Sequence, residues 1–104
     1  MATLLVFEFP SGGPFGAEAA EAYAELAADI ANQKGLVWKV WTEDPARQVA
    51  GGVYLFEDAR SAQDYTAMHT ERLAGFGISG ITATSYEVNH ELSAVDHALL
   101  TRKP

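Results

Sequence analysis

The sequence predicts an α+β fold of the ferredoxin-like type, a four-stranded antiparallel sheet with two helices on one face. Patterns typical of strands and helices follow one another in the order βαββαβ, and we expect residues 1–104 to form a single domain. The strands also carry apolar side chains on both faces, although the helices cover only one. A large uncovered apolar face usually marks an interface. We therefore expect two such sheets to pack face to face in a homodimer.

A hairpin between residues 35 and 56 forms the centre of the predicted sheet. Its strands are rich in β-branched and aromatic residues, and Pro45 lies in its loop, roughly residues 42–48. Gly51 and Gly52 stand near the start of the second strand, where glycine weakens pairing. They indicate either a bulge or the close approach of a ligand or another subunit. Because side chains alternate along a strand, the expected faces of the first strand are Leu36, Trp38 and Val40, and opposite them Val37, Lys39 and Trp41.

The remaining elements follow from similar patterns. Residues 3–9 predict the first strand, and apolar residues at helical spacing predict a helix over residues 17–33. Asp58 is a suitable N-cap for a second helix that ends near residue 74. The last strand is expected over residues 81–89, and residues 91–104 are expected to form a C-terminal tail or a short helix.

The composition excludes several classes of protein. The net charge of −7 argues against nucleic acid and membranes as partners, because both attract basic surfaces. The chain has no cysteine, which excludes disulfide scaffolds, zinc fingers and thiol nucleophiles. No apolar run approaches the roughly 18 residues of a membrane span, and the first residues lack the basic segment of a signal peptide. We expect a cytoplasmic protein.

No common catalytic motif occurs in the chain. Its three histidines, His69, His90 and His97, do not form a metal-binding pattern, so we expect no metal site. His69 is the best candidate for a general base, because imidazole titrates near neutral pH. Arg72 lies on the same face of the predicted helix and is the candidate for holding an oxyanion. The alternative for this pair is a solvated helix face or a salt bridge between subunits.

Several segments resemble the YdhR-like family of mono-oxygenases. They are Gly13–Gly16, Trp38–Glu43, Ala50–Gly52, Tyr54–Phe56, His69–Thr70 and Arg72–Leu73. The block Trp38–Glu43 is the most specific, and the likeness covers nearly the whole chain, with departures mainly in the first helix and the tail. The resemblance implies a dimeric α/β barrel, in which the ferredoxin-like sheet closes against its twin. It also implies a relationship to antibiotic-biosynthesis mono-oxygenases, which oxidise planar phenols with O2 and need no cofactor.

Such a reaction requires a base, a donor or cation for the substrate anion, and aromatic walls that exclude water. Trp38 and Trp41 lie on opposite faces of one strand, so at most one of them can line a cavity between two sheets. Lys39 is expected to pair with a carboxylate of the other subunit or with an anionic ligand, since lysine is rarely buried unpaired. For the aromatic residues, core packing is the alternative role. The candidate substrate-binding residues are Trp38, Trp41, Tyr54, Tyr65 and Lys39.

We therefore expect a homodimeric, cofactor-independent mono-oxygenase that oxidises a small planar phenol or hydroquinone with O2. Two alternatives stay open. The same fold hosts haem-binding and haem-degrading proteins, and His69 is the axial ligand that such a function would need here. A dimer that binds a small molecule without catalysis is the other alternative, because the sequence shows no dense cluster of polar residues.

Overall fold

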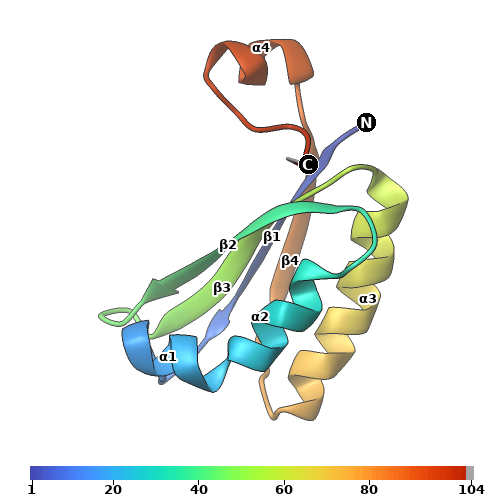
Figure 1. Cartoon of the computed structure of the whole chain (residues 1–104). Helices are drawn as coiled ribbons and strands as arrows, with labels where there is room; N and C mark the ends of the chain where they lie inside the picture. Colours follow the sequence, from blue (N-terminus) through green and yellow to red (C-terminus); the bar gives the residue numbers. More distant parts are fainter. Residues whose placement is uncertain (103–104) are drawn as a thin grey trace.

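The computed structural model describes residues 1–102 and confirms the ferredoxin-like α+β fold (Figure 1). The strands are β1 (Thr3–Pro10), β2 (Leu36–Asp44), β3 (Val49–Phe56) and β4 (Thr82–Glu87). They form one antiparallel sheet in the order β2-β3-β1-β4. The helices are α1 (Gly16–Ala22), α2 (Ala24–Ala31), α3 (Ala59–Gly75) and α4 (His90–Val95). None of these helices is long and apolar enough to cross a membrane.

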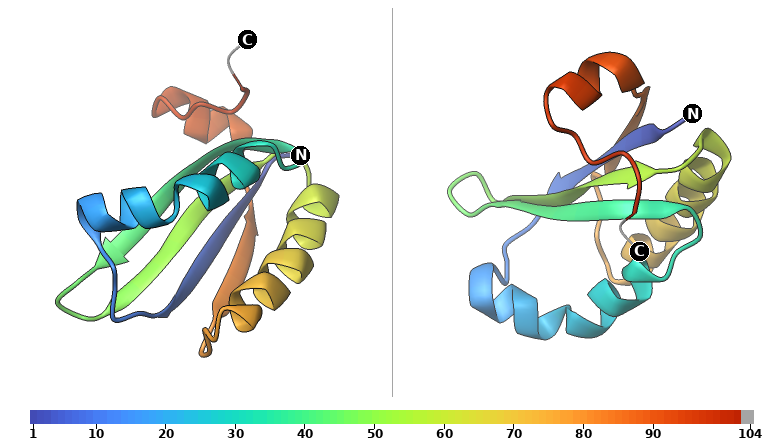
Figure 2. Two further views of the ribbon diagram at one scale, coloured as in Figure 1. Left: turned by 60° about the horizontal axis from the view of Figure 1, so that its bottom comes forward. Right: turned by 45° about the horizontal axis from the view of Figure 1, so that its top comes forward.

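The main core lies between the sheet and the helices. Figure 2 shows α1 and α2 on one side of the sheet and α4 on the other. Alternate residues of β1 and β3 point toward α2 and α3, as the period of a strand requires. Asp58 accepts a hydrogen bond from the Ser61 backbone N–H at 2.7 Å, which confirms the predicted N-cap of α3. The buried residues of this core are Leu5, Phe7, Ile30, Leu36, Tyr54, Phe56, Ala62, Tyr65 and Leu73.

The stretch that we predicted as one helix over residues 17–33 forms two helices. Tyr23 has φ −107° and ψ 15°, outside the helical region, and it separates α1 from α2. Its ring stacks on Trp41 of β2, with 6.1 Å between centroids and 14° between planes. The prediction of a single helix was therefore wrong. The apolar periodicity continues across Tyr23, so the local sequence pattern does not indicate the break.

Leu36 and Val37, the first residues of β2, each lie on the face of the sheet opposite to the one that we predicted. The pairing register with β3 shifts between Leu36 and Trp38. An extra residue in one strand reverses the alternation of side chains on one side of it. Leu36 consequently packs under the helices, while Val37 packs on the opposite face beside Trp38. Beyond the shift the predicted faces are correct, and Lys39 and Trp41 point toward the helices.

Within residues 1–102, the face of the sheet opposite α1, α2 and α3, which we name the open face, is covered only at one end. There the tail that follows β4 folds back, and the indole N–H of Trp38 donates to the Leu99 carbonyl oxygen at 2.8 Å. A guanidinium N–H of Arg102 donates to the Ala31 carbonyl oxygen at 3.0 Å. The predicted short helix in the tail is α4. The uncovered part of the open face carries Val6, Val40, Val53 and Tyr86.

Candidate active site

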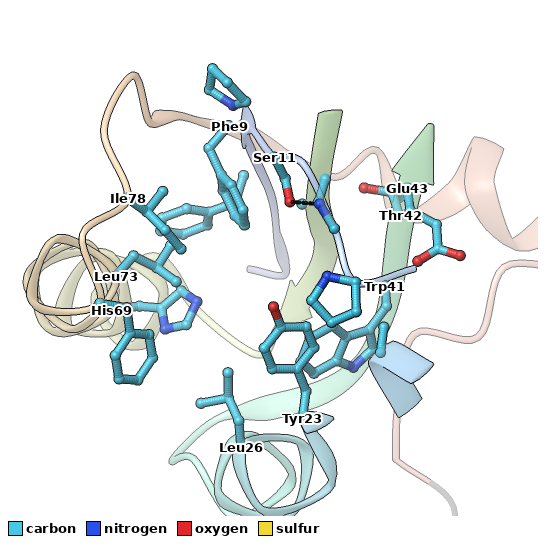
Figure 3. A pocket seen from close by; sticks show the side chains of 18 of the residues that line it. Phe9, Ser11, Tyr23, Leu26, Trp41, Thr42, Glu43, His69, Leu73 and Ile78 are labelled. Carbon is cyan, nitrogen blue, oxygen red and sulfur yellow. Dashed lines mark hydrogen bonds between the residues drawn. The ribbon is translucent and has the colours of Figure 1, made fainter. Parts of the chain in front are cut away.

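A pocket of about 460 Å³ lies between the helix-covered face of the sheet and the helices (Figure 3). That volume is typical of sites for small organic ligands. The sequence left open which face of the sheet would line a cavity, and the structure places this one under the helices. Its aromatic lining residues are Phe7, Phe9, Tyr23, Trp41, Tyr54 and Phe76.

His69 projects from α3 into this pocket and is 3% exposed (Figure 3). Two guanidinium nitrogens of Arg72, Nε and Nη2, lie 3.2 and 3.1 Å from its Nδ1. A guanidinium group only donates hydrogen bonds, so Nδ1 accepts and the ring proton is on Nε2. Arg72 is itself held by an ion pair with Asp29 of α2. The Asp29–Arg72 pair therefore selects one tautomer of His69.

The imidazole of His69 is neutral at pH 7. Burial lowers the pKa of His69 to about 3, and the charges of Arg72 and Lys39 act in the same direction. Its ring also stacks on Tyr65, with 4.9 Å between centroids. We expected His69 to be a general base. A neutral ring with an occupied Nδ1 and a proton on Nε2 is instead suited to donate a hydrogen bond.

The depressed pKa of His69 predicts that acid weakens the fold. Between pH 6.5 and about 3 the unfolded chain binds a proton that buried His69 does not bind. The free energy of unfolding is therefore expected to fall as the pH drops through this window, by up to about 1.4 kcal/mol per pH unit. Urea unfolding from pH 4 to 7 measures this slope, and His69→Phe should flatten it, while His90→Phe, at an exposed position, should not. Parallel slopes for the wild type and His69→Phe would contradict the prediction.

Lys39 lies against aromatic rings inside the same pocket. Its Nζ is 3.4 Å from the centroid of the Trp41 ring and 4.6 Å from that of Tyr54. Within residues 1–102, no carboxylate lies within 4.0 Å of this nitrogen. Burial, reinforced by the charge of Arg72, lowers the pKa of Lys39 to about 7. At neutral pH the side chain is therefore divided between amine and ammonium.

Other residues of the chain approach the backbone of Gly51 and Gly52 closely. The β3 register is regular at both positions, so neither forms the bulge that we considered. A Cβ on Gly52 would lie 2.6 Å from Lys39 Cε, and a Cβ on Gly51 would lie 2.0 Å from the carbonyl oxygen of Phe7. Gly52 thus makes room for the lysine stem that crosses it.

Two tyrosines form a hydrogen-bonded pair beside the pocket. The hydroxyl of Tyr65 donates to the hydroxyl oxygen of Tyr54 at 3.0 Å. Burial raises the pKa of Tyr65 to about 12 and raises that of Tyr54 further. Both phenols therefore remain protonated at neutral pH and serve as hydrogen-bonding groups.

The structure brings most of the predicted site residues together. Lys39, Trp41, Tyr54 and His69 line the pocket. Arg72 and Tyr65 are hydrogen-bonded to lining residues, His69 and Tyr54 respectively. Trp38 lies on the open face against the tail, away from this pocket.

The contributors that sequence reasoning missed include Phe7, Tyr23 and Asp29. Tyr23 lies in the helix that we predicted over residues 17–33, and the helical pattern does not indicate that its ring stacks on Trp41. Asp29 is 43 residues from Arg72 along the chain. Nothing in the local sequence around Asp29 indicates this ion pair.

The side chains present fit neither a metal ion nor a haem group ligated by His69. No group of three or more His, Cys, Asp or Glu residues within residues 1–102 is arranged to hold a metal. Haem iron binds an unprotonated imidazole nitrogen. Arg72 occupies Nδ1 of His69 and leaves the proton on Nε2, which opposes axial ligation by either nitrogen.

Fold and site together define a ferredoxin-like α+β domain with an aromatic pocket under its helices. The chain matches the model of a family described as "Putative mono-oxygenase ydhR" over residues 4–99, and it belongs to that family. This result confirms the resemblance seen in the sequence and supports a mono-oxygenase function of a general kind.

The structure is also similar to a crystal structure described as a putative antibiotic biosynthesis monooxygenase from Deinococcus radiodurans. The TM-score is 0.53 at 14% sequence identity, over 86% of this chain and 93% of the other. At that identity the likeness shows the fold alone. A comparison with curated proteins found no significant match.

Proposed function

We propose that the protein is a cofactor-independent mono-oxygenase that oxidises a small planar phenol or hydroquinone with O2. The observation that carries the proposal is the pocket, whose aromatic walls enclose the neutral imidazole of His69 as a fixed hydrogen-bond donor. Membership in the mono-oxygenase family supports it. A location in the cytoplasm, which suits a chain without cysteine, is part of the same proposal.

In this reaction the substrate supplies every electron. One hydroquinone and one O2 yield one hydroxyquinone and one water, so one oxygen atom enters the ring and the other is fully reduced. The protein must hold the substrate as an electron-rich anion and keep out bulk water. The N–H of His69 stabilises the anion, and Phe7, Tyr23 and Trp41 supply flat walls for the ring.

Oxygen uptake tests this proposal. Planar hydroquinones such as 1,4-dihydroxynaphthalene are expected to raise the melting temperature by mass action and to be consumed with one O2 each. EDTA should not slow the reaction, and 18O2 should leave one labelled atom in the product. The matched control is 1,4-dimethoxynaphthalene, which has the same ring but cannot form an anion. Stabilisation without oxygen uptake by any phenol of such a panel would instead support the non-catalytic binding protein.

We also propose that the protein is a homodimer in which two open faces pack together. Val40 and Tyr86 on this face are each 55% exposed. The tail adds Leu92, Val95 and Leu99, which are 66%, 74% and 56% exposed. A second copy would cover these side chains, and apolar surface of this kind favours association.

Sedimentation equilibrium tests the dimer. The wild type is expected to sediment as a dimer at micromolar concentration, and Val40→Glu should shift it to a monomer, because the carboxylate would be buried opposite a second apolar sheet. Ala20→Glu adds the same charge at an exposed position of α1 and should leave the dimer intact. A monomeric wild type would contradict this part of the proposal.

A further inference from the structure

We propose that Lys39 accepts the proton of the bound phenol and that the resulting anion lies between the Lys39 ammonium and the N–H of His69. The inference rests on the proposed function and identifies the base that this function requires. Lys39 therefore acts as the base in its amine form and then binds the substrate anion in its ammonium form.

The geometry around Lys39 suits a proton acceptor. Its Nζ lies over the faces of Trp41 and Tyr54 and has no carboxylate partner within residues 1–102. The ring faces stabilise an ammonium group, whereas burial and the charge of Arg72 oppose it and lower the pKa of Lys39 to about 7. The amine is consequently available at neutral pH, where a general base is most effective.

The other titratable groups around the pocket do not fit this role. Tyr54 is a phenol whose pKa is raised by burial, so it stays protonated. Glu43 lies on an exposed part of β2, and its carboxylate accepts a hydrogen bond from the Gly16 N–H at 2.9 Å. His69 has an occupied Nδ1 and carries its proton on Nε2. The groups facing the pocket are Tyr23, Lys39, Glu43, Tyr54 and His69, with Asp29, Tyr65 and Arg72 behind them.

The proton transfer balances within the pocket. The O–H bond of the phenol breaks, its electron pair stays on oxygen, and the proton forms a fourth bond to Nζ of the Lys39 amine. The anion then reduces O2 itself, and the proton held on Lys39 passes to the reduced oxygen atom that leaves as water. Each turnover therefore returns Lys39 to the amine.

The test uses 4-nitrophenol, whose anion absorbs visible light, with the wild type, Lys39→Met and Lys39→Arg. The wild type is expected to bind the probe as the coloured anion below the pH at which the free probe ionises. Lys39→Met should bind the probe as the colourless neutral phenol. Lys39→Arg should bind the anion, because a guanidinium is a permanent cation, yet lose about 10²–10⁴-fold in kcat for hydroquinone oxidation, because it cannot accept a proton. Lys34→Met, at an exposed lysine, should behave as the wild type does.

The outcomes separate this inference from the proposed function. If Lys39→Met yields the coloured anion and turns over hydroquinone as the wild type does, Lys39 is not the base, although the function stands. If the Lys39→Arg variant oxidises hydroquinone at the wild-type rate, only a positive charge at position 39 is needed and the inference also fails. If the wild type neither binds 4-nitrophenol nor consumes O2 with any planar phenol, the proposed function fails and the inference fails with it. Lys39→Met is expected to melt no lower than the wild type, because it removes a buried ionisable group, so lost colour does not reflect unfolding.

Discussion

Replacing Gly51 with alanine is expected to lower the free energy of unfolding by about 3 kcal/mol or more, the upper end of the usual cost of overpacking. The new Cβ would lie 2.0 Å from the carbonyl oxygen of Phe7 and 2.9 Å from its carbonyl carbon. These are main-chain atoms of β1, which pairs with β3 on one side and β4 on the other. Relief of the clash therefore requires a shift of the backbone in the middle of the sheet.

Urea unfolding monitored by circular dichroism measures this effect. Gly12→Ala is the matched control, because Gly12 lies in the loop at the pocket and a Cβ there meets no atom within 4 Å. We expect the control to unfold within about 0.5 kcal/mol of the wild type, as exposed substitutions usually do. A Gly51→Ala protein that is as stable as the control would contradict the close approach of the Phe7 carbonyl group to Gly51.

His69→Phe is expected to lower kcat for hydroquinone oxidation by about 10²–10³-fold, the usual effect of removing one donor to an oxyanion. Phenylalanine preserves the aromatic contacts of the His69 ring with Phe7 and Tyr65, whose centroids lie 5.2 and 4.9 Å away. It removes the N–H that we assign to the substrate anion, and with it the Nδ1 acceptor of Arg72, which keeps its ion pair with Asp29. The expected loss is therefore in the chemical step and not in the shape of the pocket.

Steady-state oxygen uptake with each variant measures this loss. His69→Gln keeps a side-chain N–H donor and should recover part of kcat, whereas a purely structural role for His69 predicts no such recovery. His90→Phe, at an exposed position of α4, should have the activity of the wild type. Full activity of His69→Phe would remove His69 from the mechanism.

Much of the fold was predictable because its signals are local. The order of the elements follows from hydrophobic periods of two and of 3.6 residues, and the start of α3 follows from Asp58 as an N-cap. The spacing of His69 and Arg72 placed them on one face of a helix, and the structure joins them by hydrogen bonds. Each of these conclusions depends on residues within a few positions of one another.

The errors occurred where distant residues decide the local geometry. The break at Tyr23 coincides with the stacking of its ring on Trp41 of another element. The register shift between Leu36 and Trp38 depends on pairing with β3. A helical or strand period continues through both sites, so the sequence pattern does not contain this information.

The chemistry of the site was decided by tertiary structure. The sequence by itself determined the ferredoxin-like order of elements, the family resemblance and four of the residues that line the pocket, Lys39, Trp41, Tyr54 and His69. Only the fold joined Asp29 to Arg72, which selects the tautomer of His69, and placed Lys39 between Trp41 and Tyr54. The physical reason is that the proton affinity of a side chain depends on its burial and on nearby charges. Both are properties of the packed molecule, to which residues far apart in the sequence contribute.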